Sequence, residues 1–243
     1  MPHKFRLTPQ IQKDLRKIEL ACKAIQRQKI SAIARKEAWH HFLRYFEMLE
    51  ELSPSKKELK RYITAYTQIV AWVESKTPIS EEKIKLLHAI ILGNKRPTRY
   101  RKGQNGVLDP VTYEVLYYPP KAKDVPFLMK SLVAWINQAA YPCPVVAAIA
   151  HFGINSIHPF YDGNGRCARL LTKWIVMRGG FDLEGLLCLE EYYAKDLNAY
   201  YNALTIGHSS NYYEGPANHD ISSWLGYFCK GMAYSCQRAL QAR

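Results

Sequence analysis

A short run of polar and charged residues lies between two strongly apolar stretches of the chain. It contains His158, Asp162, Asn164, Arg166 and Arg169. Histidine titrates near neutral pH and can remove a proton from a hydroxyl group, whereas a carboxylate and guanidinium groups suit a divalent ion and a polyphosphate. A connection between core helices has no need of such groups. The segment therefore indicates a site for phosphate chemistry.

The spacing within this run predicts how it would hold an anion. Gly163 and Gly165 allow the backbone to pass close to a ligand, and a helix that begins near Arg166 would point its free N–H groups at that ligand. Arg166 and Arg169 are three residues apart, so both lie on one face of that helix. Phosphate is the anion that this arrangement favours.

The run from His158 to Arg169 matches every fixed position of the pattern H-P-F-x-D-G-N-G-R-x-x-R. This pattern is the signature of the Fic family, which the chain resembles over roughly residues 80–233. The resemblance implies a mainly α-helical Fic fold. In that fold a helical bundle surrounds a central buried helix, and a β-hairpin flap covers the active site.

The resemblance implies a protein adenylyltransferase, which moves AMP from ATP to a Tyr, Ser or Thr hydroxyl of a target protein and releases pyrophosphate. His158 would be the general base, and Asp162 would hold Mg²⁺ or Mn²⁺. Glycine at position 165 favours nucleotidyl transfer, because relatives with lysine there resemble Doc, which phosphorylates its target. The residues expected to bind the phosphates of ATP are Gly163, Asn164, Gly165, Arg166 and Arg169.

Two further regions gain expected roles from the same resemblance. Tyr201 and Leu204 match positions that line the adenosine pocket, although His208 replaces the asparagine expected about one turn later. The flap would dock the target segment by strand addition. Its candidate residues are Val115, Leu116, Tyr117 and Tyr118.

Many Fic proteins carry an inhibitory glutamate that pairs with the second arginine of the motif, here Arg169. Glu37 and Glu47 lie in the expected N-terminal region without the usual flanking residues, and Glu214 lies in a downstream match to the short inhibitory pattern. A separate basic cluster either steers ATP or an acidic target to the site or is a solvated loop. Its members are Lys95, Arg96, Arg99, Arg101 and Lys102.

The remainder of the chain predicts the helices that carry these groups. Thr8 and Pro9 predict one helix start, Ser55 and Glu58 form a capping box at another, and a further helix begins near Ser80. The segment 144–157 is apolar on nearly all sides and predicts the central helix. We expect residues 1–78 to form a helical extension packed on a Fic core of residues 79–243.

Composition limits the other functional classes. The chain has 243 residues, a net charge of +13 and six cysteines without paired spacing, and it has no run of 18 apolar residues. We therefore expect no signal peptide or membrane span, and a location in the cytoplasm or, for a secreted effector, in a host cytosol. Expected partners are a nucleotide and a protein with an exposed hydroxyl. A homodimer is compatible with the sequence, and nucleic acid is not expected.

Three alternatives to AMP transfer stay open at this stage. The same fold can transfer UMP, GMP or phosphocholine, or it can remove AMP from a modified target. A basic helical module that binds a partner without catalysis is a third reading, which the complete motif disfavours.

Overall fold

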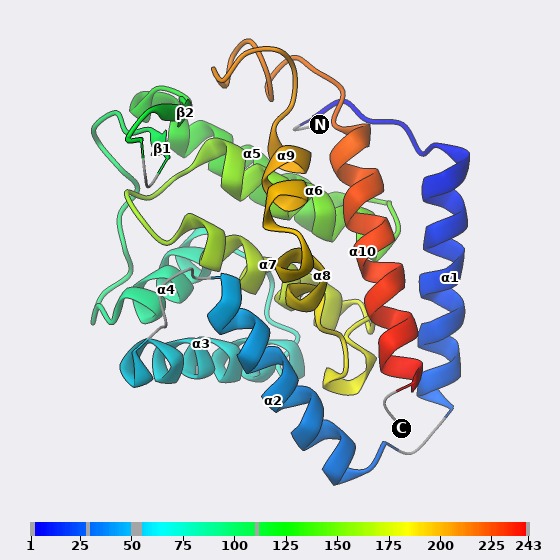
Figure 1. Cartoon of the computed structure of the whole chain (residues 1–243). Helices are drawn as coiled ribbons and strands as arrows, with labels where there is room; N and C mark the ends of the chain where they lie inside the picture. Colours follow the sequence, from blue (N-terminus) through cyan, green and yellow to red (C-terminus); the bar gives the residue numbers. More distant parts are fainter. Residues whose placement is uncertain (1–2, 28–29, 50–54, 110–111, 242–243) are drawn as a thin grey trace.

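The computed structural model describes residues 3–27, 30–49, 55–109 and 112–241, and within these ranges it leaves the side chain of Glu47 undescribed. Helices dominate the described chain, and one small antiparallel hairpin interrupts them (Figure 1). The helices are α1 (Pro9–Gln26), α2 (Ala32–Leu49), α3 (Lys56–Glu74), α4 (Glu81–Leu92), η1 (Ala122–Asp124), α5 (Val125–Gln138), α6 (Cys143–Ile157), α7 (Asn164–Arg178), η2 (Leu183–Gly185), α8 (Leu189–Lys195), α9 (Leu197–Leu204) and α10 (Ser222–Gln241).

Helix α6 is the central buried helix that the apolar segment predicts. Pro144 lies in its first turn, where a proline is tolerated, and every residue from Pro144 to Ile157 except Asn155 is buried. Helix α5 packs close to it because Gly153 has no side chain, and an added Cβ there would lie 2.7 Å from Leu132. The helix ends at His158, which adopts the left-handed conformation.

The N-terminal helices pack on both sides of this core. Helix α1 lies alongside α10, with Ile11 close to Gly226 (Figure 1). Helix α3 packs on α7, where the rings of Trp72 and Trp174 lie 4.7 Å apart. One hydrophobic cluster contains residues from both predicted parts of the chain, and the division at residue 78 stays a prediction.

The predicted helix starts agree with the structure. Thr8 accepts the N–H of Ile11 ahead of α1, and Ser80 caps α4. Ser55 and Glu58 form both bonds of the predicted capping box at the start of α3. The mainly α-helical architecture is therefore confirmed. No helix in the described part of the chain is long and apolar enough to cross a membrane.

The predicted hairpin consists of strands β1 (Val107–Leu108) and β2 (Val115–Tyr117). The strands pair antiparallel, with Val107 opposite Tyr117. The hydroxyl of Tyr117 donates to the carbonyl of Ser156 at 2.7 Å, which ties the hairpin to the last turn of α6. This bond places the flap beside the turn that carries His158.

Candidate active site

His158 lies at the point where α6 ends and the motif loop begins. Its N–H donates to the carbonyl of Ile154, and its Nδ1 lies 3.3 Å from the carbonyl oxygen of Asn155. A carbonyl can only accept, so Nδ1 carries the proton and Nε2 is left as the acceptor. Burial lowers the pKa of His158 to about 4, so the imidazole is neutral at neutral pH. A neutral imidazole with a defined acceptor nitrogen is suited to remove a proton.

The loop after His158 is closed by a side chain rather than by regular secondary structure. The Asn164 amide oxygen accepts the N–H of Phe160, and its amide nitrogen donates to the carbonyl of Phe160, both at 3.0 Å. Asn164 is almost completely buried. Its side chain thus fixes the loop, and its direct contact with phosphate, which the sequence predicts, stays a prediction.

A second histidine supports the same loop from α4. The ring of His88 stacks on Phe160 with centroids 3.7 Å apart, and its Nε2 donates to the carbonyl of Asp162 at 2.6 Å. An added Cβ on Gly163 would lie 3.1 Å from this nitrogen, so the glycine leaves room for His88. Sequence reasoning missed His88, because only the fold brings α4 to the motif loop.

Helix α7 begins directly at this loop, with Gly163 in the left-handed conformation ahead of it. The N–H groups of Asn164, Gly165 and Arg166 belong to its first turn, where the helix offers them no carbonyl partner. Such a turn attracts anions. The loop that begins at His158 therefore leads directly into a helix N-terminus with free backbone donors.

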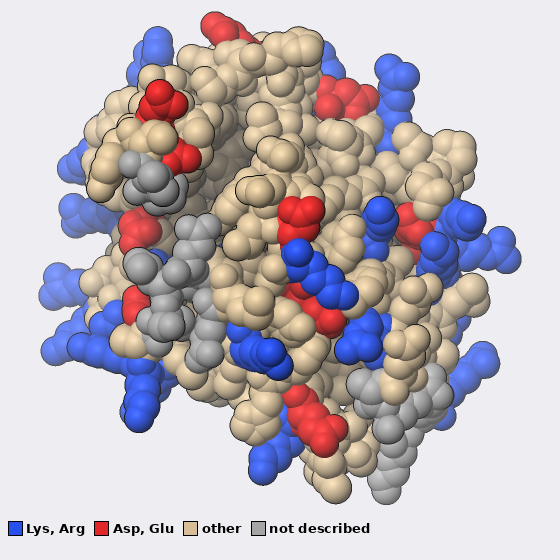
Figure 2. Space-filling view, viewed as in Figure 1, with Lys and Arg blue, Asp and Glu red and all other residues tan. Residues whose placement is uncertain are grey.

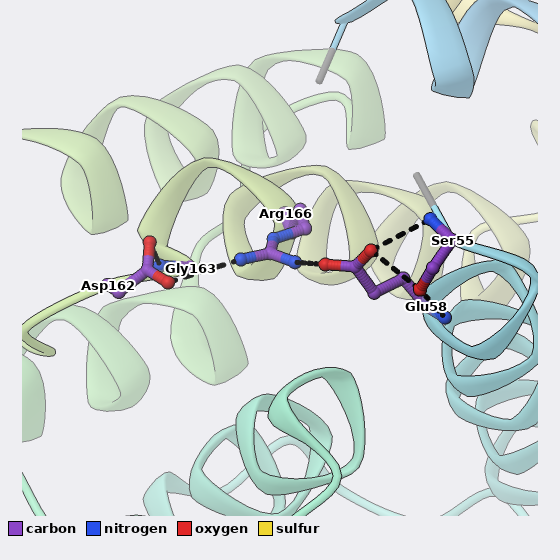
Figure 3. Close-up of polar contacts among 5 residues, drawn as sticks. All are labelled: Ser55, Glu58, Asp162, Gly163 and Arg166. Atoms are coloured by element: carbon purple, nitrogen blue, oxygen red, sulfur yellow. Dashed lines mark hydrogen bonds and ion pairs between the residues drawn. The ribbon is translucent and has the colours of Figure 1, made fainter. Parts of the chain in front are cut away.

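Two carboxylates hold Arg166 next to this first turn (Figure 3). Its guanidinium lies 3.4 Å from Oδ2 of Asp162 and 4.0 Å from Oε1 of Glu58. Glu58 comes from the capping box of α3, where its other oxygen accepts bonds from Ser55. The sequence located the capping box but gave no sign that it faces Arg166, because that contact joins two helices far apart in the chain.

Arg169 occupies a different environment from Arg166. Its side chain is buried, with 6% of the residue exposed, and the ring of Phe46 from α2 lies 6.0 Å from the guanidinium carbon. The positive charge of this guanidinium partly offsets the rise in the pKa of Tyr200 on α9 that burial causes. The two arginines predicted to bind phosphate therefore differ in exposure. Arg166 is partly exposed, whereas Arg169 is buried beneath α2.

Arg101 does not belong to an exposed basic cluster, contrary to the sequence-based expectation. It is 2% exposed, and its guanidinium donates to the carbonyls of His158, Gly103, Pro120 and Ile157. Its charge compensates carbonyl groups at the end of α6 and joins them to the flap. Arg101 is therefore a structural link between the flap and the His158 turn.

The other predicted members of the cluster, Lys95, Arg96, Arg99 and Lys102, are exposed. Lys and Arg side chains gather on the surface over α3 and α4, the helix that this loop follows (Figure 2). A role in steering ATP or an acidic target stays a prediction.

The predicted flap residues divide into two groups. Leu116 is exposed, whereas Tyr117 is bonded to α6. The backbone of Tyr118 pairs with residues 210–212, donating to Ser210 and accepting from Tyr212. Tyr118 is therefore not a free position for strand addition, and the sequence could not show this because its pairing partner is more than 90 residues away.

The remaining sequence candidates lie on or near these elements. Tyr201 and Leu204 are on α9, with Tyr201 next to Tyr200, and their contact with adenosine stays a prediction. Glu37 is exposed on α2, and Glu214 accepts a bond from Ser209 in a loop. Glu47 is on α2 directly after Phe46, and its side chain lies outside the described residues.

A metal ion at this site would depend on a bound nucleotide for most of its ligands. The described residues contain no group of three or more His, Cys, Asp or Glu side chains that could hold an ion alone. The Asp162 carboxylate is 77% exposed and borders the first turn of α7. Mg²⁺ commonly uses one carboxylate together with phosphate oxygens and water, so Asp162 fits that ion.

Comparison with known proteins agrees with this geometry. Residues 78–176 match the sequence model of the Fic/DOC family. A segment of 123 residues is 34% identical to the protein adenylyltransferase Fic of Drosophila ananassae and covers 48% of this chain and 23% of that protein. The chain thus matches less than a quarter of the length of its curated relatives.

Solved structures show the same fold. A Fic family protein from Desulfovibrio desulfuricans has a TM-score of 0.81 at 19% identity, over 99% of this chain and 77% of that one. IbpAFic2 covalently tethered to Cdc42 has a TM-score of 0.60 at 15% identity, over 91% and 70%. The helical bundle and the motif loop define a Fic-fold protein. The part of the chain that matches the Fic/DOC family model, residues 78–176, contains α4 and the motif loop.

Proposed function

We propose that the chain is a protein adenylyltransferase, which transfers AMP from ATP to a hydroxyl side chain of another protein. The observation that carries this proposal is the position of His158. It ends α6 directly before the loop and the first turn of α7 that carry Asp162 and Arg166, and its bond to Asn155 leaves Nε2 as the acceptor. The curated relatives named protein adenylyltransferase support the same reaction.

In the proposed reaction, Nε2 of His158 removes the proton from the target hydroxyl. The hydroxyl oxygen then bonds to the α-phosphorus of ATP, the bond from that phosphorus to the oxygen bridging to the β-phosphate breaks, and pyrophosphate leaves. The hydrogen bond from Nδ1 to Asn155 keeps the ring in the orientation that leaves Nε2 free.

The charge that develops on the phosphates meets donors already in place. The N–H groups at the start of α7 and the guanidinium of Arg166 would bind phosphate oxygens, and Arg166 would exchange its contact with Asp162 for one with phosphate. Mg²⁺ held by Asp162 would supply further positive charge to the phosphates.

The burial of Arg169 bears on regulation of this activity. Because Phe46 of α2 lies over its guanidinium, an outer phosphate reaches Arg169 only if α2 shifts or its side chains rearrange. We infer that α2 restrains nucleotide binding, and Glu47, which follows Phe46 on this helix, is the leading inhibitory candidate. Glu37 is less favoured because it is exposed on α2, and Glu214 because it accepts a bond from Ser209 in a loop.

The proposed substrate is a protein segment that docks on the hairpin. Leu108 and Leu116 expose apolar side chains there, and the hairpin lies beside the His158 turn. IbpAFic2, which has the same fold, was solved in a covalent complex with the protein Cdc42. The identity of the target of this chain is left to experiment.

The test uses purified protein with Mg²⁺ and ATP labelled at the α-phosphate, alone and with a cell lysate. Wild type should label a protein, and His158→Ala should lower the rate by at least about 100-fold, because general-base catalysis contributes that much. His40→Ala is the control, since His40 is an exposed histidine outside the site. Label that persists in His158→Ala would refute the proposed role of His158.

The donor is tested in the same experiment. UTP, GTP and CDP-choline are supplied in parallel, and the mass added to the product identifies the transferred group. AMP-modified target incubated without ATP tests removal of AMP by hydrolysis. A preference for any donor over ATP would replace AMP transfer with that reaction.

A further inference from the structure

The loop that follows α4 carries positive charge that the rest of the described chain does not neutralise. The sequence has no Asp or Glu between Glu82 and Asp109. Four exposed cations of this loop form no ion pair with a carboxylate in the described part of the chain. We call these four residues, Lys95, Arg96, Arg99 and Lys102, the basic loop. Uncompensated cations of this kind attract an anionic partner from outside the chain.

Helix α3 extends this charged surface. The Arg61 guanidinium lies directly over Gly93, the residue at which α4 ends and the loop begins. Lys60, next to it in the chain, is exposed. Lys and Arg side chains gather on the surface over α3 and α4 (Figure 2). The positive surface therefore combines two segments that are far apart in sequence.

The backbone of the basic loop is held in a defined position. The N–H of Thr98 donates to the carbonyl of Lys85 on α4 at 3.1 Å, and the N–H of Arg101 donates to the carbonyl of Pro159 in the motif loop at 2.9 Å. A surface that is ordered before it binds loses less conformational entropy on binding. The basic loop thus differs from a freely solvated loop of the same composition.

Tyr161 fastens the end of the basic loop to the motif loop. This residue occupies a position that the family pattern leaves open, and 62% of it is exposed. Its hydroxyl oxygen accepts the N–H of Lys102 at 3.2 Å and the N–H of Gly103 at 2.8 Å. The position of the Lys102 charge is therefore tied to the loop that carries His158.

The chain directly after the basic loop contacts both the motif loop and the flap. The Gln104 amide donates to the carbonyl of Pro119 at 2.9 Å, just beyond strand β2, and the Asn105 amide donates to the carbonyl of Phe160 at 3.2 Å. The basic loop thus adjoins the element on which a protein segment is proposed to dock. A nucleotide would bring its charge to the start of α7 instead, where Arg166 and free N–H groups are present.

We propose that the basic loop is a docking surface for an acidic segment of the target protein, next to the hydroxyl that receives AMP. This inference rests on the proposed function, because it takes a protein as the substrate and the flap as its docking element. Complementary charges at the edge of an interface accelerate association and select among partners. A solvated loop would instead act through the net charge of the chain alone.

The probes are two fluorescein-labelled peptides of equal length with Tyr, Ser and Thr at the centre, flanked by Glu residues in one and by Gln residues in the other. Binding is measured by fluorescence anisotropy without ATP, at low and at high salt. The loop variant carries Lys95→Glu, Arg96→Glu and Arg99→Glu. The matched control carries the same three changes at exposed positions of α1 and its C-cap, Lys13→Glu, Arg16→Glu and Arg27→Glu. Thermal unfolding checks the fold of each variant.

Wild type should bind the Glu peptide about tenfold more tightly than the Gln peptide at low salt, and high salt should reduce this preference. The loop variant should lose the preference, whereas the control should keep it within about twofold. Tyr161→Phe leaves every charge in place but removes the acceptor of two N–H groups, so it should bind the Glu peptide about threefold more weakly. The affinity of the loop variant for ATP with Mg²⁺ should stay within about twofold of the control.

Equal loss of Glu-peptide binding in the loop variant and the control would overturn the inference, because net charge alone would then explain it. A wild type that does not distinguish the two peptides, or that binds duplex DNA more tightly than the Glu peptide, would also overturn it. Weaker ATP binding by the loop variant than by the control would assign the cations to the nucleotide instead. Unchanged binding in Tyr161→Phe would reject the fastening by Tyr161.

Peptide binding is measured without transfer, which separates this inference from the proposed function. Loop-dependent binding of the Glu peptide without any AMP transfer by wild type would keep the docking surface and reject the reaction. His158-dependent transfer to a protein at equal rates in the loop variant and the control would reject the docking surface and keep the reaction.

Discussion

Replacement of Arg101 should both destabilise the fold and impair catalysis. Its two short hydrogen bonds run from Nε to the carbonyl of His158 at 2.9 Å and from Nη2 to the carbonyl of Pro120 at 2.5 Å. A hydrogen bond from a charged donor contributes about 1.5–3 kcal/mol, and the bonds to Gly103 and Ile157 are longer and weaker. Arg101→Met keeps much of the side-chain volume, so we expect a loss of about 3–5 kcal/mol in the free energy of unfolding.

The measurement is urea unfolding at pH 7, together with the rate of AMP transfer. Arg99→Met is the matched control, because Arg99 is exposed two residues earlier, and a surface change of this kind is usually within about 0.5 kcal/mol. Arg101→Lys should be intermediate, since one ammonium group cannot reach both carbonyls. The rate should fall by about 100-fold in Arg101→Met, because the flap and the His158 turn lose their common anchor. Equal unfolding midpoints for Arg101→Met and Arg99→Met would refute this reasoning.

Three further predictions concern pH, regulation and metal binding. The folded-state pKa of His151, about 3, is below its unfolded value of 6.5, so between these pH values the unfolded chain binds one more proton than the folded chain. The free energy of unfolding should therefore fall by up to about 1.4 kcal/mol per pH unit below pH 6.5. Urea unfolding at pH 7 and pH 5 measures this fall, which should be smaller in His151→Gln. Glu47→Gly should increase self-labelling or target labelling several-fold, whereas the exposed Glu37→Gly should not; equal labelling of both would exclude Glu47 as the inhibitory residue. In Asp162→Asn, the Mg²⁺ concentration needed for half-maximal ATP binding should rise by at least about tenfold at unchanged thermal stability. An unchanged magnesium titration would mean that other ligands hold the ion.

Local patterns in the sequence were sufficient to predict the helices and the motif loop. The capping box at Ser55 and Glu58 and the apolar segment of α6 each depend on residues within a few turns of one another, so spacing alone predicts them. The type of each motif residue likewise indicates phosphate chemistry without knowledge of the fold. Predictions of this kind agree with the structure because their physical causes are local.

The errors and omissions concern contacts between distant segments. In the sequence, Arg101 is one of several neighbouring Lys and Arg residues. Only the fold shows that carbonyl groups from the end of α6 and from the flap surround it. Tyr118 has the β-propensity of a docking strand, but its backbone is already paired with residues 210–212. The contact of Glu58 with Arg166 and the support of the loop by His88 also join separate helices. No spacing rule within one helix could have found them.

The pairing of α1 with α10 sets an order for folding during synthesis. Ile11 lies close to Gly226, so the apolar face of α1 is completed by a helix that is synthesised long after it. Helix α1 therefore leaves the ribosome long before its partner exists. Contacts this distant in sequence form late and slow folding. The apolar face of α1 thus stays exposed on the nascent chain until α10 has been made.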